Sequence, residues 1–179
     1  NAFMGIVEPG SAKPQSFFAN SDLHDGQVLI DTEKNIISVL DFGQAVAISN
    51  TEREQAIRFL LALELSSGEN ADTKSSLKLL NELRQRWSPG SQTITETDLS
   101  ALQLSTDRMD RFIKVLWLFG KTQVKTPLPV IQWILGLNRL LSLSHRIDKP
   151  IDGKIRSLLR ADYLGIPLKY HNRWRRIVE

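Results

Sequence analysis

The chain has 179 residues, of which 41% are apolar and 24% charged, and this composition is typical of a single globular domain. Its net charge of +3 argues against a dedicated nucleic-acid binder, and the lack of cysteine excludes disulfides and thiolate metal sites. The most apolar run, residues 128–143, is broken by Gln132, Asn138 and Arg139, whereas a membrane span needs about 20 apolar residues. We therefore expect a protein that is cytoplasmic or peripheral to a membrane, with no nucleic-acid partner.

A β-hairpin is the first element that the sequence pattern predicts. The apolar, partly β-branched runs 28–30 and 36–40 flank a polar turn at 31–35, which is typical of two antiparallel strands. The second run leads directly into Asp41-Phe42-Gly43. The pattern therefore places an Asp-Phe-Gly turn at the end of the second strand.

Helices are predicted for most of the chain that follows the hairpin. Ser49 or Asn50 can cap the first of them, which reaches Leu65. Residues 112–119 are apolar almost all round, so we expect this segment to be buried. We also interpret four large side chains as core, namely Trp117, Phe119, Trp133 and Leu137. Apolar residues at helical spacing predict the remaining helices over 72–87, near 97–104, and over 106–120, 128–146 and 152–164.

The predicted fold class is mainly α, with one short β-hairpin followed by about six helices. A basic, aromatic stretch at the end of the sequence can be read as a contact with an anionic membrane surface. We favour the other reading, a solvated tail whose Trp174 packs back on the core. The expected single domain, 1–179, then comprises an irregular lead-in at 1–16, the hairpin region at 17–49, the helical region at 50–164 and the basic tail at 165–179.

Three polar side chains around the hairpin have the spacing of a phosphotransferase site. Asp22 and Gln27 are five residues apart, and Asp41 follows Asp22 by nineteen. Protein kinases place a catalytic Asp, a metal-binding Asn and the metal-binding Asp of the Asp-Phe-Gly turn in this order. Phosphoryl transfer requires an oriented hydroxyl and a neutralised phosphate charge, and Mg²⁺ takes hard oxygen ligands such as carboxylates and amides. The spacing therefore predicts a kinase-type catalytic loop with a Mg²⁺ site.

The same residues carry a family resemblance. Residues 17–27, FFANSDLHDGQ, resemble the FFHADPHPGN motif of the UbiB/AarF atypical kinases, and residues 40–44, LDFGQ, resemble their metal-binding DFG motif. The likeness continues into 51–54, which opens the next helix of that family, and it resurfaces faintly at 128–148. It implies the C-terminal lobe of a protein-kinase-like fold, α+β when complete, that binds ATP with Mg²⁺. It also implies kinase or ATPase activity linked to isoprenoid quinone (ubiquinone-type) biosynthesis or lipid homeostasis, and an isoprenoid-lipid or quinone-pathway partner.

The resemblance assigns a role to each matching position. It makes Asp22 the catalytic-loop Asp and Asp41 a Mg²⁺ ligand. Gln27 stands where the family has a metal-binding Asn, and its side chain is one methylene longer. The other ATP-binding residues that the resemblance implies are His24, Phe42 and Gly43, although His24 suits a structural hydrogen bond equally well.

Two further interpretations stay open. The sequence Asp22-Leu23-His24 is closer to the wording of aminoglycoside and choline kinases, which are small-molecule phosphotransferases. A non-catalytic pseudokinase module is the other interpretation, because Gln27 replaces the usual Asn. A kinase also needs a β-rich N-terminal lobe with a phosphate-covering loop and a Lys, which the residues before Asp22 do not supply. We therefore expect the chain to be a partial one that is inactive on its own.

Overall fold

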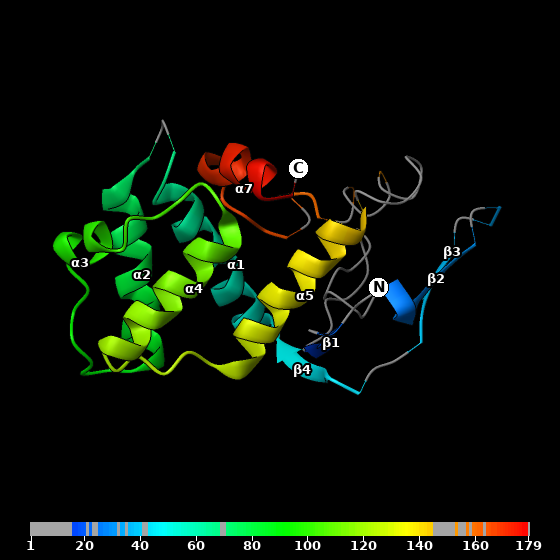
Figure 1. The fold of residues 1–179 in the computed structure, drawn as a ribbon, viewed down its shortest axis with the longest axis horizontal. Helices are drawn as coiled ribbons and strands as arrows, with labels where there is room; N and C mark the ends of the chain where they lie inside the picture. Colours follow the sequence, from blue (N-terminus) through cyan, green and yellow to red (C-terminus); the bar gives the residue numbers. More distant parts are fainter. Residues whose placement is uncertain are drawn as a thin grey trace. The chain divides into compact units, whose positions relative to one another are not determined.

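The computed structural model describes residues 16–20, 22, 25–31, 33–34, 36–40, 43–68, 71–144, 153, 157, 159–162 and 164–178 (Figure 1). It is mainly helical, with two small sheets ahead of the helices. The chain divides into two compact units, a first unit made of Asn1–Arg53 and Pro129–Glu179 and a second unit made of Glu54–Leu128. A compact unit is not by itself an independent domain, so the single domain expected from the sequence stays a prediction.

Both sheets belong to the first unit. Strand β2 (Val28–Asp31) pairs with β3 (Ile36–Val39) in antiparallel register, with Val28 opposite Val39. In the turn between them, the Asp31 carboxylate accepts a hydrogen bond from the Lys34 backbone N–H at 3.0 Å. The predicted hairpin is thereby confirmed. Strand β1 (Ser16–Asn20) pairs antiparallel with β4 (Ala45–Ser49), a long-range ladder that the local pattern does not reveal.

Helix α1 (Asn50–Leu65) begins with a capping box. The Ser49 hydroxyl accepts a hydrogen bond from the Glu52 backbone N–H at 3.2 Å, and the Glu52 carboxylate accepts one from the Ser49 backbone N–H at 2.7 Å. Two N–H groups that would otherwise lack a helical partner are satisfied in this way. Of the two caps that the sequence allows, Ser49 is therefore the one in use.

This cap gives a direct test of the start of α1. We expect Ser49→Ala to lower the free energy of unfolding by about 1 kcal/mol, because it removes the acceptor for the Glu52 N–H. Urea unfolding followed by circular dichroism measures the loss. Ser100→Ala, at an exposed position of a helix in the second unit, is the matched control and should change the value by less than about 0.5 kcal/mol. Equal losses in the two variants would argue against the cap.

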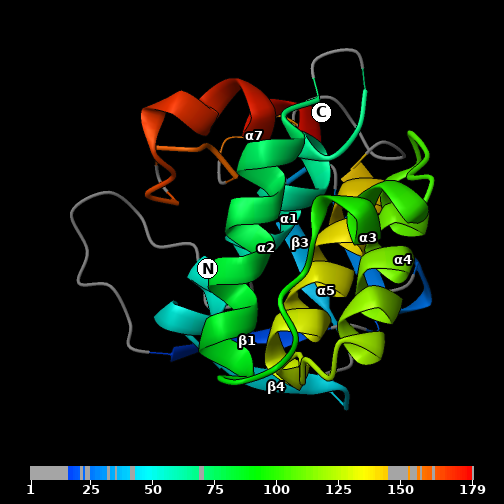
Figure 2. The same cartoon turned by 90° about the vertical axis from the view of Figure 1, so that its left-hand side faces the viewer.

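Three helices of the second unit each begin directly after a residue whose side chain caps the helix. After α1 come α2 (Thr73–Trp87), α3 (Glu96–Ala101) and α4 (Arg108–Lys121), drawn in teal and green in Figure 2. Asp72 and Asp107 cap α2 and α4 by accepting backbone N–H groups of the first turn, and Thr95 with Asp98 forms a capping box on α3. All three helices lie within two or three residues of their predicted bounds.

An aromatic cluster forms the core of the second unit. The Phe59 ring of α1 stacks on Phe119 at 5.5 Å between centroids and meets the edge of Trp87 at 6.0 Å. Phe112 completes the cluster at 5.8 Å from Phe59. The indole N–H of Trp87 donates to the Gln55 side-chain oxygen at 2.8 Å, so the polar end of this side chain is satisfied. Offset and edge-on pairs at these distances are favourable beyond their burial alone.

The outer side of α4 differs from the expectation that residues 112–119 are buried. Ile113 is 58% exposed and Trp117 is 62% exposed, so the prediction is wrong for these two residues. The buried side chains of α4, including Val115 and Phe119, form one stripe, and the exposed pair lies off it. The Lys121 ammonium lies 5.7 Å from the centroid of the Trp117 ring, a cation–π distance that suits an exposed aromatic side chain.

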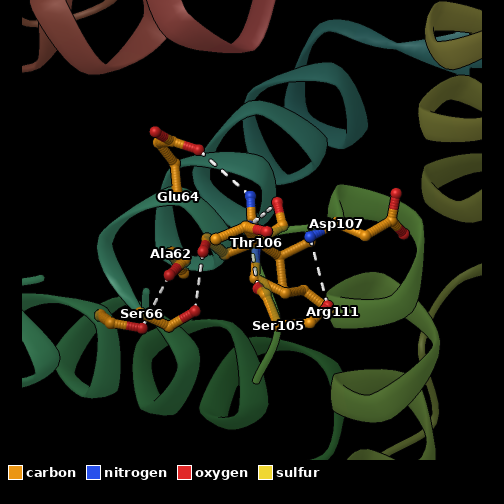
Figure 3. A network of polar contacts seen from close by, with 9 residues as sticks. Ala62, Glu64, Ser66, Ser105, Thr106, Asp107 and Arg111 are labelled. Atoms are coloured by element: carbon orange, nitrogen blue, oxygen red, sulfur yellow. Dashed lines mark hydrogen bonds and ion pairs between the residues drawn. The ribbon is translucent and has the colours of Figure 1, made fainter. Parts of the chain in front are cut away.

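A buried ion pair connects α1 with α4 inside the second unit. The Arg111 guanidinium contacts the Glu64 carboxylate at 3.2 Å and donates to the backbone carbonyls of Ser105 and Thr106 at 3.1 and 2.6 Å (Figure 3). Nearby, the buried Ser76 hydroxyl donates to the Ala62 carbonyl at 2.7 Å. The loop before α4 is therefore fixed by charge-assisted hydrogen bonds as well as by the cap of the helix.

In the first unit, the part of α5 (Leu128–Ser144) from Pro129 onward has one buried side, formed by Val130, Trp133, Ile134, Leu137 and Leu141. Its fully buried residues recur at helical spacing. They include Trp133 and Leu137, which confirms the interpretation of these two residues as core. Phe119 of the second unit is likewise buried, as expected. Within the residues that the structure describes, no helix is both long enough and apolar enough to cross a bilayer.

The end of the chain is more ordered than a tail. A short 3₁₀ turn η3 (Leu168–Tyr170) leads into α7 (His171–Val178), and Trp174 is 1% exposed. The indole N–H of Trp174 donates to the Leu159 carbonyl at 2.7 Å, which confirms that this residue packs back on the core. A helix is expected over 152–164, and the described residues Gly153 and Ser157 are helical. Residues 159–162 form turns or irregular chain, so the predicted end of this helix is wrong.

Candidate functional site

Asp22 lies in a turn immediately after β1, and Asn20 shapes that turn. The Asn20 side-chain oxygen accepts a hydrogen bond from the Asp22 backbone N–H at 2.9 Å. Asn20 is only 1% exposed, whereas Asp22 is half-buried. This contact is an Asx-turn, in which an Asn side chain replaces a backbone carbonyl and bends the chain. The Asp22 backbone is therefore held by a buried side chain while its own side chain keeps some access to solvent.

Helix α5 approaches the same segment very closely at Gly136. A Cβ atom on this glycine would lie 2.6 Å from the Asn20 carbonyl oxygen and 3.3 Å from the Asn20 carbonyl carbon. Real Cβ atoms do not come this close to backbone atoms, which cannot rotate out of the way as a flexible side chain can. The position therefore suits glycine alone, and β1 ends directly against the backbone of α5.

Gln27 lies at the opposite end of the candidate catalytic loop. It closes a short 3₁₀ turn, η2 (Asp25–Gln27), just before β2, and it is 9% exposed. Its backbone carbonyl accepts a hydrogen bond from the Leu40 N–H at 2.8 Å, which extends the hairpin ladder by one step. The residue opposite Gln27 is therefore the one immediately before Asp41 in the chain.

The two ladders enclose both acidic segments. At one end Asn20 pairs with Ala45, and at the other end Gln27 is bonded to Leu40. The chain leaves the first pair and enters the second through residues 21–26, and it returns through residues 41–44. Paired residues of antiparallel strands lie about 5 Å apart. Residues 21–26 and residues 41–44 are thus two short segments of chain that both join the Asn20–Ala45 pair to the Gln27–Leu40 pair. The first of these segments contains Asp22.

The remaining predicted residues are placed only in part. Gly43 lies in an exposed turn ahead of β4. His24, Asp41 and Phe42 lie outside the described residues. Among the residues that the structure does describe, no group of three His, Asp or Glu side chains is close enough to hold a metal ion. The roles expected of these residues in binding Mg²⁺ and ATP therefore stay predictions.

Two residues of this site escaped the sequence reasoning. Asn20 was recognisable in principle, since an Asn side chain often accepts a hydrogen bond from the backbone N–H two residues further on. Gly136 left a weaker signal, because a glycine inside an apolar helix has many explanations. No protein-family model, curated protein or solved structure matches this chain. The geometry of the described residues is therefore the basis on which a function can be argued.

Proposed function

We propose that the chain carries the metal-side half of an ATP- and Mg²⁺-dependent phosphotransferase or ATPase site, on a kinase-like C-terminal lobe of the UbiB/AarF type. The observation that supports this most is the pair of ladders that encloses residues 21–26 and 41–44. Leu40 and Ala45 are five Cα steps apart in the chain and can be separated by at most about 18 Å. The length of the chain alone therefore limits how far the ladder that ends at Leu40 can lie from the ladder that begins at Ala45.

In this proposal each residue has one task. Asp22 orients the attacking hydroxyl or water, which suits a half-buried carboxylate on a turn that is fixed by Asn20. Asp41 supplies a charged oxygen ligand to Mg²⁺, and Gln27 supplies an amide oxygen. When bound, Mg²⁺ neutralises the charge on the transferred phosphoryl group. A link to isoprenoid quinone biosynthesis or lipid homeostasis rests on the motif resemblance alone.

Metal binding tests the proposal directly. We expect the 179-residue chain to bind Mn²⁺, a paramagnetic substitute for Mg²⁺, in the presence of ATP, and Asp41→Asn to weaken this binding about tenfold or more, because it removes a charged ligand. Electron paramagnetic resonance measures free Mn²⁺ in such a titration. Gln27→Asn should retain binding, because it keeps the amide oxygen on a shorter stem.

Asp31→Asn is the matched control for this experiment. Asp31 lies in the same hairpin, and its side chain is 41% exposed and paired with Lys34 at 3.4 Å. Its loss removes one negative charge from the same region and should leave Mn²⁺ affinity nearly unchanged. Equal Mn²⁺ affinity in the wild type and in Asp41→Asn would show that Asp41 is not a metal ligand. If neither the wild type nor Gln27→Asn binds Mn²⁺ with ATP, the pseudokinase interpretation replaces the phosphotransferase.

A further inference from the structure

We infer that Asn20 and Gly136 are positioning residues for Asp22, forming a buttress in which helix α5 holds the start of the catalytic loop. This inference rests on the proposed function for its catalytic meaning, whereas the buttress itself rests on contacts among described residues of the first unit. Neither the kinase-type spacing nor the resemblance assigns a role to Asn20 or Gly136.

The first component is the side chain of Asn20. A polar side chain that is 1% exposed must be hydrogen-bonded to be tolerated in the interior. One of its bonds is the 2.9 Å contact from the Asp22 backbone N–H. Because Asn20 is also the last residue of β1 and is paired with Ala45, its backbone has little freedom. The Asp22 turn is therefore bonded to a point that cannot move independently of the sheet.

The second component is the backbone contact at Gly136. Glycine is a poor helix former, so a buried glycine in a helix interior needs a reason in the packing. The reason here is the 2.6 Å distance between its hypothetical Cβ and the Asn20 carbonyl oxygen. On the same helix, Trp133 is fully buried and Leu137 is 1% exposed, so α5 cannot withdraw without opening the core. An added methyl group must instead displace Asn20, and with it the Asp22 turn.

A second helical glycine provides a matched control. Gly120 in α4 has no heavy atom within 4 Å of its hypothetical Cβ. Gly120→Ala therefore makes the same chemical change in a helix with no backbone to displace. If Gly136→Ala changes the Asp22 signal and Gly120→Ala does not, the change comes from the contact with Asn20. The general effect of alanine on a helix is the same in both variants.

The experiment measures the Asp22 backbone amide by nuclear magnetic resonance in the 179-residue chain. We expect Gly136→Ala to shift this signal and Asn20→Ala to accelerate its hydrogen exchange about tenfold, since one hydrogen bond is lost. Asn20→Asp keeps an acceptor at the same place and should retain the slow exchange. Gly120→Ala should leave the signal unchanged. If Gly136→Ala fails to fold, the pair Asn20→Ala and Asn20→Asp still tests the inference.

Broadening of the Asp22 signal by Mn²⁺ with ATP separates the inference from the proposed function. Broadening in the wild type that Gly136→Ala and Asn20→Ala reduce, and that Asn20→Asp retains, supports both. An Asp22 amide that responds to the variants but is not broadened by Mn²⁺ and ATP supports the buttress and overturns the proposed function. An unchanged Asp22 shift and exchange rate in Gly136→Ala and Asn20→Ala overturns the buttress, whether or not the metal binds.

Discussion

Replacing Phe59 with alanine should lower the free energy of unfolding by about 3–5 kcal/mol, one of the two largest effects expected in this chain. Phe59 is fully buried, and its ring contacts Trp87, Phe112 and Phe119. Its removal loses the transfer free energy of the ring and leaves a cavity that three rigid aromatic side chains cannot fill. Urea unfolding at equilibrium, analysed by linear extrapolation, measures the difference.

Trp117→Ala is the control for this prediction, because it also truncates an aromatic side chain of the second unit. Trp117 is 62% exposed, so its removal opens no cavity and should change the free energy of unfolding by less than about 1 kcal/mol. The opposite ranking of the two variants would mean that the aromatic cluster is not the core of this unit. Phe59→Leu should lie between them, since it keeps part of the buried volume.

The elements that could be predicted from the sequence are those that local chemistry determines. The hairpin follows from two β-branched runs around a polar turn, and the structure pairs Val28 with Val39 as that pattern requires. The helices follow from apolar periodicity together with short polar caps, of which Ser49 is one of the two that the sequence offers for α1. In each case the signal and its structural cause lie within a few residues of one another.

The features that could not be predicted depend on contacts between distant segments. An apolar run such as 112–119 does not say which of its sides meets the core, and Trp117 is turned outward. Helix α7 has a short, strongly basic sequence, and its helical arrangement becomes evident only when Trp174, Ile177 and Val178 are seen buried together. The pairing of β1 with β4 joins residues that are 25 to 33 positions apart, as from Asn20 to Ala45 and from Ser16 to Ser49, and no local pattern specifies it.

The candidate site also combines a local feature, which the sequence reveals, with a long-range contact, which it does not. The spacing of Asp22, Gln27 and Asp41 is a local feature from which the sequence predicts them as a group, and their roles stay predictions. The way in which the chain holds Asp22 is not local, because Asn20 and Gly136 are separated by more than a hundred residues and meet only in the folded first unit. The sequence thus indicates the candidate catalytic residues, whereas the contact of Asn20 with Gly136 becomes evident only in the fold.

Arg111→Ala should likewise destabilise the protein by about 3–5 kcal/mol, through charge rather than volume. The Arg111 side chain is 6% exposed, and its loss leaves the Glu64 carboxylate, itself 15% exposed, without this partner. It also removes the donor to the carbonyls of Ser105 and Thr106. A largely buried carboxylate and two backbone carbonyls of the loop then lack the hydrogen bonds that Arg111 supplies. Urea unfolding measures this loss as well.

Two variants determine whether the loss comes from the ion pair. Lys114→Ala breaks the exposed Lys114–Asp110 pair of the same helix, 2.9 Å long, and should cost no more than about 1 kcal/mol. Arg111→Ala combined with Glu64→Gln should recover part of the loss, because the Glu64 charge that would lack Arg111 is then absent. Recovery should be incomplete. Burial lowers the pKa of the neighbouring Arg108, and Glu64 opposes that shift, so the double variant also deprives Arg108 of a favourable charge. A double variant no more stable than Arg111→Ala would assign the loss to the loop carbonyls instead.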